Sequence, residues 1–229
     1  RTEGQIDDLI EEIRLRAGKP LQVEAGCSGF ITASGEFTGA PDNALWIEED
    51  DLQRTLQLMG GNSLYTLEEE MKEGFITLPG GHRVGLSGEC LTAEGRLLRI
   101  RRVTGMNIRV ARQLVGCALQ LLPSLTEEGR PLRTLIISPP QAGKTTLLRD
   151  IIRCFSNGEG IPFPVKIGLV DERNEISGSY QGVPQLDVGL RTDVLSGCPK
   201  GEGIFLLLRS MGPQVIATDE IGKIEDVES

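Results

Sequence analysis

One segment in the second half of the chain constrains the fold more than any other feature. It reads SPPQAGKTT at residues 138–146, and it lies between a short apolar run at 135–137 and a helical pattern at 145–155. A strand, a loop containing Gly-Lys-Thr and then a helix is the arrangement of a Walker A loop, in which backbone N–H groups bind phosphate oxygens. The sequence therefore predicts an α/β domain with a phosphate site at the start of this helix.

Several residue types in this loop have a chemical role. The residues expected to contact nucleotide phosphates are Pro139, Pro140, Gln141, Ala142, Gly143, Lys144, Thr145 and Thr146. Lys144 carries positive charge towards the β- and γ-phosphates, and the Thr145 hydroxyl is a ligand for Mg²⁺. Ser138 stands where the consensus has glycine, so we expect a slightly altered loop. The alternative is a chance Gly-Lys-Thr turn, which the flanking patterns disfavour.

Acidic residues end two further apolar runs. Residues 215–217 lead to Asp219 and Glu220, a Walker B pattern in which Asp219 holds Mg²⁺ and Glu220 polarises the attacking water. Residues 169–175 include Glu172 and Glu175, which we expect at the ligand-binding edge of a parallel sheet, where either one orients the water or the metal. The alternatives are a solvated strand end and a solvated turn. The expected cofactors are ATP and Mg²⁺, and the candidate catalytic residues are Lys144, Glu175 and Glu220.

The chain divides into two parts with different patterns. Apolar runs at 135–137, 165–170 and 215–217, separated by helical stretches, indicate a parallel sheet in the second part. Elsewhere the patterns predict strands at 12–16, 75–78, 82–87 and 96–103, and helices at 49–59, 66–72 and 110–122. We therefore expect a small α+β domain at 1–104 and a P-loop ATPase core at 105–229.

Charge and composition exclude several classes of function. The net charge is −9 and aromatic residues make up 4% of the chain, which disfavours general binding of nucleic acid. No apolar run approaches the roughly 20 residues that span a bilayer. The five cysteines are interpreted as free thiols in a reducing compartment, and the single histidine, His82, as a structural residue rather than a zinc ligand.

Arginines crowd one stretch of this acidic chain. They are Arg96, Arg99, Arg101, Arg102, Arg109 and Arg112. If Leu98 and Ile100 face a core, Arg99 and Arg101 share the opposite face of a strand. In a ring such residues can reach a neighbouring subunit's γ-phosphate. The alternative is a solvated strand face, or pairing with local glutamates.

The motifs together resemble a known family. The segments that carry the likeness are 135–152, 170–176, 188–195, 198–200, 209–211 and 219–222, with 80–85 and 107–109 in the first part. They closely resemble the stage III sporulation protein AA family and, more distantly, the traffic ATPases of type II secretion, type IV pili and type IV secretion. The resemblance implies a RecA-like core in a hexameric ATPase under a membrane channel, in the mother cell of a spore-forming bacterium. It also implies other stage III sporulation membrane proteins as partners, and Glu175 as a general-base candidate beside Glu220.

The resemblance also sets an expectation for the end of the chain. Nine residues follow Glu220, too few for a helix and a strand. We therefore expect a C-terminally truncated core that lacks the strand which relatives insert between the Walker A and Walker B strands. The alternative is direct pairing of those two strands. The expected function is an ATP-binding and ATP-hydrolysing subunit, cytoplasmic and peripheral at the membrane through its partners. The alternatives are a nucleotide-dependent assembly scaffold and a nucleic-acid translocase, and the charge balance disfavours the translocase.

Overall fold

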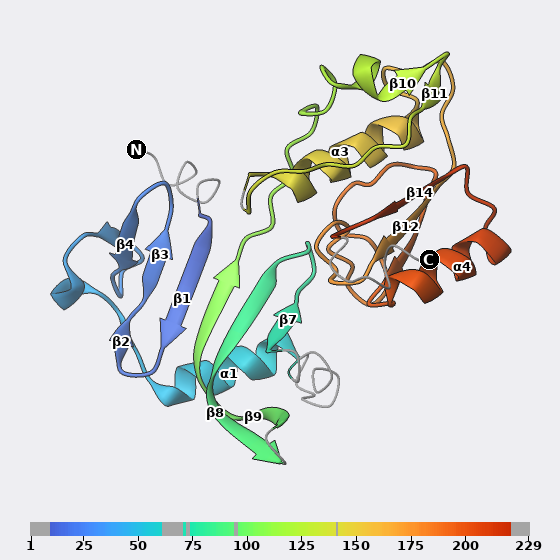
Figure 1. Cartoon of the computed structure of the whole chain (residues 1–229). Coiled ribbons are helices and arrows are strands. Elements are labelled where there is room, and N and C mark those ends of the chain that lie inside the picture. The colour runs from blue at the N-terminus through green and yellow to red at the C-terminus, as the bar shows by residue number, and fades with distance from the viewer. Residues whose placement is uncertain (1–9, 61–70, 72–73, 94–95, 141, 221–229) are drawn as a thin grey trace. The chain divides into compact units, whose positions relative to one another are not determined.

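The computed structural model describes residues 10–60, 71, 74–93, 96–140 and 142–220. The chain forms two compact units, Arg1–Ala111 and Arg112–Ser229. Figure 1 shows the elements of each unit. No helix in the described ranges is both long enough and apolar enough to cross a membrane.

A seven-stranded antiparallel sheet forms the first unit, in the order β5-β4-β3-β1-β9-β8-β7. Its strands are β1 (Glu12–Arg16), β3 (Gln22–Glu24), β4 (Ser28–Ile31), β5 (Phe37–Thr38), β7 (Phe75–Thr77), β8 (Arg83–Ala93) and β9 (Arg96–Arg109). A small second sheet pairs β2 (Lys19–Pro20) with β6 (Trp46–Ile47). The strand predicted at 12–16 is confirmed, and the three predicted at 75–103 are present with longer bounds for β8 and β9.

Helix α1 (Glu49–Met59) covers part of this sheet. A capping box starts the helix, because Glu48 and Asp51 each accept a backbone N–H from the other's position. Leu52 and Leu56 are buried one helical turn apart and pack with sheet residues in one apolar core. The predicted helix at 49–59 is therefore confirmed. The helix predicted at 66–72 lies, except for residue 71, outside the described residues.

Three arginines of β9 pair with glutamates inside the first unit. Arg101 lies 3.7 Å from Glu89, Arg102 pairs with Glu49, and Arg109 Nε lies 3.2 Å from Glu12. Register shifts between β8 and β9 also change the strand's alternation, so that Ile100 is buried while Leu98 is 47% exposed. These contacts match the local-pairing alternative for Arg101, Arg102 and Arg109.

His82 lies in the turn before β8. Its Nδ1 accepts the backbone N–H of Ala111 at 3.0 Å, and its carbonyl accepts the N–H of Leu78 at 2.8 Å. The ring thus ties the turn to the end of the first unit. This contact agrees with the structural role expected for His82.

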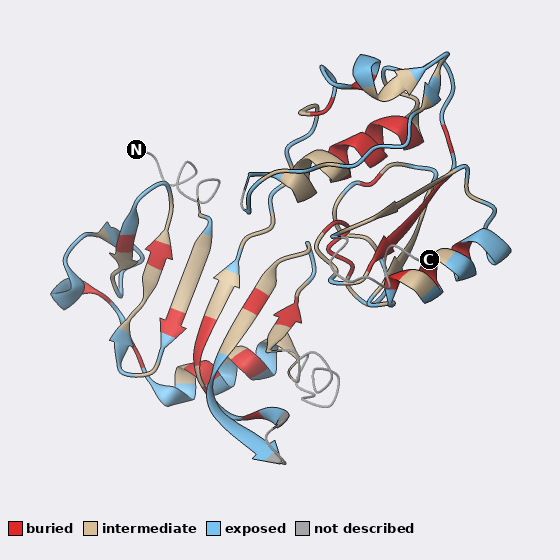
Figure 2. Cartoon of the chain, in the orientation of Figure 1, coloured by how far each residue is buried: buried red, intermediate tan, exposed pale blue. Residues whose placement is uncertain are grey.

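The second unit contains a three-stranded parallel sheet with a helix on each face. Its strand order is β13-β12-β14, where β12 is Ile167–Asp171, β13 is Thr192–Ser196 and β14 is Val215–Thr218. Ile167 and Leu169 pack with α3 (Lys144–Asn157), and the alternate positions, Gly168 and Val170, meet α4 (Lys200–Ser210). β12 is buried along its whole length, as Figure 2 shows. The parallel sheet is confirmed for the predicted runs at 165–170 and 215–217, and the helix at 145–155 is confirmed.

Two further elements complete the second unit before α3. A 3₁₀ helix at Leu122–Leu125 leads into a hairpin of β10 (Thr126–Glu127) and β11 (Arg130–Pro131). Leu122 is fully buried against α3, so this connection belongs to the same apolar core.

The helix predicted at 110–122 is wrong. Residues 110–114 are irregular and 115–121 form turns. Gly116 takes a left-handed φ of 88°, and the backbone N–H groups of Gly116 and Ala118 bond to the Asp150 carboxylate at 3.1 and 2.8 Å. The backbone here donates to a buried side chain of α3 instead of to helical carbonyls. This tertiary bond overrides the apolar spacing of the segment.

The strand predicted at 135–137 is also wrong. Residues 132–139 are all described and form neither helix nor strand. Among the described residues, β14 pairs only with β12 and lies at the edge of its sheet. The sequence left open that residues 135–137 pair directly with β14. The structure does not contain this pairing, because residues 135–137 form no strand. Leu135 and Ile137 are 68% and 83% exposed, while Ile136 between them packs against the core under α3.

Candidate functional site

Helix α3 starts directly after the predicted phosphate-binding loop. Gly143 caps the helix with a left-handed φ of 86°, and a Cβ built there meets nothing within 4 Å. The space beside the cap is therefore open, while the backbone conformation favours glycine. Lys144 folds back over the loop, where its Nζ donates to the carbonyl oxygens of Ser138 and Pro139, each at 3.0 Å. Gln141, one of the predicted phosphate contacts, lies outside the described residues.

The start of α3 lies at the carboxyl edge of the sheet. In its second turn, the buried Arg149 donates to the carbonyls of Glu175 and Ile176, just after β12 ends. At its other end, Asn157 Oδ1 accepts the N–H of Leu190 at 2.9 Å, just before β13 begins. The helix therefore runs antiparallel to the strands. Its N-terminal N–H groups therefore lie at the same edge of the unit as the residues that follow β12 and β14.

A network of hydrogen bonds fixes the loop after β12. Asp171 is fully buried, and its carboxylate accepts the backbone N–H groups of Glu175 at 2.9 Å, Ile176 at 3.1 Å and Ser177 at 2.7 Å. Asn174, with a left-handed φ of 55°, bonds through its side chain to the backbone of Ser179. Asp171 therefore has a structural role, and it fixes the backbone of the candidate base Glu175.

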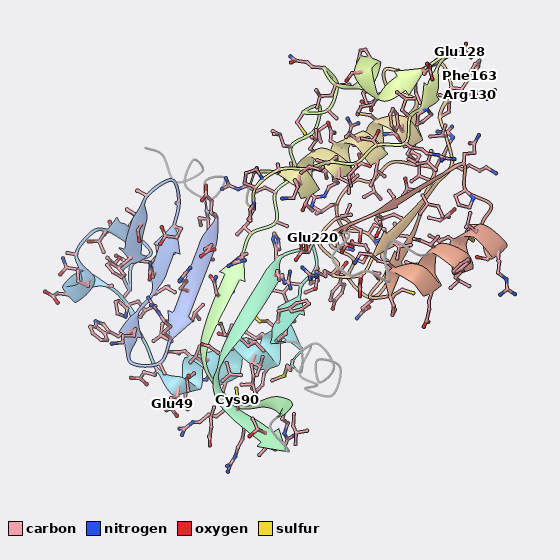
Figure 3. All side chains as sticks on the ribbon, viewed as in Figure 1. Glu49, Cys90, Glu128, Arg130, Phe163 and Glu220 are labelled. Atoms are coloured by element: carbon pink, nitrogen blue, oxygen red, sulfur yellow. The ribbon has the colours of Figure 1, made fainter. Side chains whose placement is uncertain are left out.

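The two acids after β14 are both paired with cations. One oxygen of Asp219 lies 3.1 Å from Lys200 Nζ, and the other accepts the backbone N–H of Arg173 at 3.4 Å. Glu220, labelled in Figure 3, accepts a 2.9 Å bond from the Arg173 guanidinium. Lys200 also lies 2.5 Å from Glu172. The acids predicted at the ends of β12 and β14 are thus joined through two basic residues.

Lys200 is a functional candidate that sequence reasoning missed. Its side chain is 7% exposed, in the first turn of α4. Burial disfavours the ammonium, but hydrogen bonds to Glu172 and Asp219 outweigh that effect and raise the pKa of Lys200. The signal in the sequence is a lysine three residues before Gly203 and seven before Leu207, on the face that α4 turns to the sheet.

The residues present suit both a nucleotide and a magnesium ion. The open space at the Gly143 cap and the N–H groups of the first turn of α3 suit phosphate oxygens. Asp219 and the Thr145 hydroxyl offer the oxygen ligands that Mg²⁺ prefers. Asp219 already holds a cation, the Lys200 ammonium, so the potential at this carboxylate suits positive charge. Within the described part of the chain, Thr145 and Asp219 make no hydrogen bond with each other.

The chain resembles solved ATPases in its fold. The Legionella pneumophila ATPase DotB superposes with a TM-score of 0.56 at 15% identity, over 97% of this chain and 58% of that one. The pilus retraction motor PilT with bound ADP gives a TM-score of 0.54 at 16% identity, over 98% and 60%. This chain spans less than two thirds of either solved chain. The expected fold class, an α/β chain with a RecA-like core, is confirmed at the level of the fold.

Sequence comparisons identify the family. The stage III sporulation protein AA of Bacillus subtilis (strain 168) is 44% identical over 221 residues, which are 96% of this chain and 68% of that protein. The family model described as "Sporulation stage III, protein AA" matches residues 2–229. The chain therefore belongs to the stage III sporulation protein AA family.

Proposed function

We propose that this protein is an ATP-binding and ATP-hydrolysing subunit of a secretion-type ATPase ring that powers a membrane transport apparatus during sporulation. The observation that carries the proposal is that three groups lie at the same edge of the second unit. These are the start of α3 with Lys144, the fixed loop that carries Glu175, and the Asp219-Glu220 pair after β14. Phosphoryl transfer needs a phosphate cradle, a metal ligand and a group that orients water, and these three elements supply them.

Each residue has one task in this proposal. The N–H groups at 142–146 and Lys144 bind the phosphates, and Thr145 and Asp219 hold Mg²⁺, which neutralises charge on the phosphates when bound. Glu175 and Glu220 are the two candidates for orienting the attacking water. Glu175 extends from a backbone that Arg149 and Asp171 hold in place. Glu220 accepts a hydrogen bond from Arg173 and has to leave it to act.

The assembly is part of the same proposal. A homo-oligomer, with a hexamer as the expected form, places each site beside a neighbouring subunit. The sporulation family and the fold shared with DotB and PilT support a peripheral protein on the cytoplasmic face of the mother-cell membrane, bound to other stage III sporulation membrane proteins. Its ligands are then ATP and Mg²⁺, without nucleic acid.

A second function is a nucleotide-dependent assembly scaffold with little turnover. The observation that favours it is the internal pairing of the site. Lys144 binds its own loop, Asp219 pairs with Lys200, and Glu220 pairs with Arg173. A subunit in this state has to break several contacts before hydrolysis. The scaffold predicts ATP-dependent oligomers without release of phosphate.

Phosphate release by the full-length protein separates the two functions. We expect wild-type protein to hydrolyse ATP, and Lys144→Ala and Glu220→Gln each to lower kcat by about 10²-fold or more. Lys166→Ala, at an exposed lysine on the same unit, is the matched control and keeps the wild-type rate. Equal rates in all four proteins contradict the hydrolase, and ATP-dependent oligomers without turnover in wild-type protein favour the scaffold.

A further inference from the structure

Lys200 lies between two carboxylates that come from different strands. Its Nζ is 2.5 Å from Glu172, which follows β12, and 3.1 Å from Asp219, which follows β14. The Lys200 and Asp219 side chains are each 7% exposed, and Glu172 is 31% exposed. One buried ammonium therefore bridges the acid expected to hold the metal and a second acid beside it.

The position of Lys200 is fixed by close packing of α4 on β12. A Cβ on Gly203 would lie 2.6 Å from Val170 Cγ1, so the helix backbone lies almost against the strand. Lys200, Gly203 and Leu207 are the buried residues of α4 and lie on its inner face. The stem of Lys200 therefore emerges at the carboxyl ends of β12 and β14, and a rotation of the helix away from these carboxylates would break the packing.

The helix itself does not favour a cation at this place. Lys200 is the first residue of α4, where the positive end of the helix dipole repels positive charge. Burial of an ammonium is also costly unless it is paired. The two carboxylates thus supply the attraction that keeps Lys200 in place.

The geometry points to Lys200 as a built-in counter-cation that occupies the metal side of Asp219 and stops Glu172 and Asp219 from capturing a free divalent ion. Two carboxylates that both reach one nitrogen are close enough to bind one hard cation between them. With the ammonium in place, the pair keeps a net charge of −1 and its oxygens are already in use. Asp219 then becomes available only when the metal arrives with nucleotide phosphates, and Lys200 stays with Glu172. The release of Asp219 to a metal that arrives with nucleotide rests on the proposed function.

The first experiment measures binding of Mn²⁺ alone to the full-length protein, without nucleotide, by electron paramagnetic resonance. Lys200→Met removes the charge at similar volume, Lys200→Arg keeps the charge, and Lys166→Met removes the same charge from an exposed site of the unit. We expect Lys200→Met to bind Mn²⁺ at least about tenfold more tightly, and Asp219→Asn in that background to reverse the gain. The other two variants stay within about twofold of wild type. Wild-type affinity in a folded Lys200→Met protein overturns the inference.

If Lys200→Met fails to fold, a second variant tests whether Lys200 competes with the metal at Asp219. Glu172→Gln removes the alternative partner of Lys200, so that the ammonium binds Asp219 alone and competes more strongly with the metal. We expect the Mg²⁺ concentration needed for half-maximal binding of a fluorescent ATP analogue to rise by about threefold or more. An unchanged Mg²⁺ requirement overturns the inference.

The Mn²⁺ titration and the nucleotide titration together distinguish a failure of the Lys200 inference from a failure of the proposed function. Tighter Mn²⁺ binding by Lys200→Met supports the role of Lys200 even if wild-type protein binds no ATP analogue, in which case only the proposed function fails. Nucleotide binding by wild-type protein, together with equal Mn²⁺ affinity in wild type and Lys200→Met, leaves the proposed function standing and overturns the inference.

Discussion

Buried charges on α3 are paired inside the second unit. Asp150 is 1% exposed, accepts the N–H groups of Gly116 and Ala118, and lies 2.7 Å from Arg153 Nε. Arg153 also pairs with Glu159. Burial alone would raise the pKa of Asp150, but the hydrogen bonds from Ala118, Arg153 and Gly116 outweigh it and lower that pKa. The carboxylate therefore links α3 to the segment that leads into the unit.

Asp150→Asn tests this link. Because the pKa of Asp150 is lower in the folded state, its ionised form stabilises the fold above the ordinary value of 3.8, and this contribution is lost as the pH falls through the lower folded pKa. At pH 7 we expect the variant to lower the free energy of unfolding by about 3 kcal/mol, and the deficit to shrink below pH of about 4. Hydrogen exchange of the α3 amides at each pH measures this loss of unfolding free energy.

The control for Asp150→Asn is Glu127→Gln, an exposed acid of the same unit. We expect it to change the free energy of unfolding by less than about 0.5 kcal/mol at any pH. A deficit in Asp150→Asn that is equal at pH 7 and pH 3 would show that the carboxylate charge does not supply the stabilisation.

At the scale of elements, local signals decided which predictions were right. Helix α1 has a capping box and a clear apolar face, and α3 has a left-handed glycine at each end, so both could be recognised from sequence. The segments at 110–122 and 135–137 carry the right apolar residues, yet their structure depends on partners elsewhere. Asp150 takes up the amides of the first, and the second lacks a neighbouring strand within the described residues.

Residues 135–137 show a strand-like alternation of burial without strand pairing. Ile136 packs on the α3 core, and Ile137 is 83% exposed. We expect Ile136→Ala to lower the free energy of unfolding by about 1–2 kcal/mol, less than for a fully buried isoleucine. The matched variant Ile137→Ala changes it by less than about 0.5 kcal/mol. Chemical denaturation monitored by circular dichroism compares the two, and equal losses would contradict the described orientation of this segment.

At the scale of the whole molecule, the fold class and the family followed from sequence. The pairing of the site carboxylates with Lys200 and Arg173 did not. The Gly-Lys-Thr loop and the Asp-Glu pair predicted which residues belong to the candidate site. Lys200 was missed because its role depends on α4 lying against β12, a contact made by Gly203 and Leu207. The spacing to Gly203 and Leu207 places Lys200 on the inner face of α4, but its carboxylate partners become visible only once β12 and β14 are placed.

The central claim is that the start of α3 binds a nucleoside triphosphate beside Asp219. Titration of the full-length protein with a fluorescent ATP analogue and Mg²⁺ tests it most directly. We predict saturable binding to wild-type protein and to Lys166→Ala, and an affinity at least about tenfold weaker in Lys144→Ala, because that variant loses the cation on the phosphates. Equal affinity in wild type and Lys144→Ala, or no binding by wild-type protein, would contradict the account.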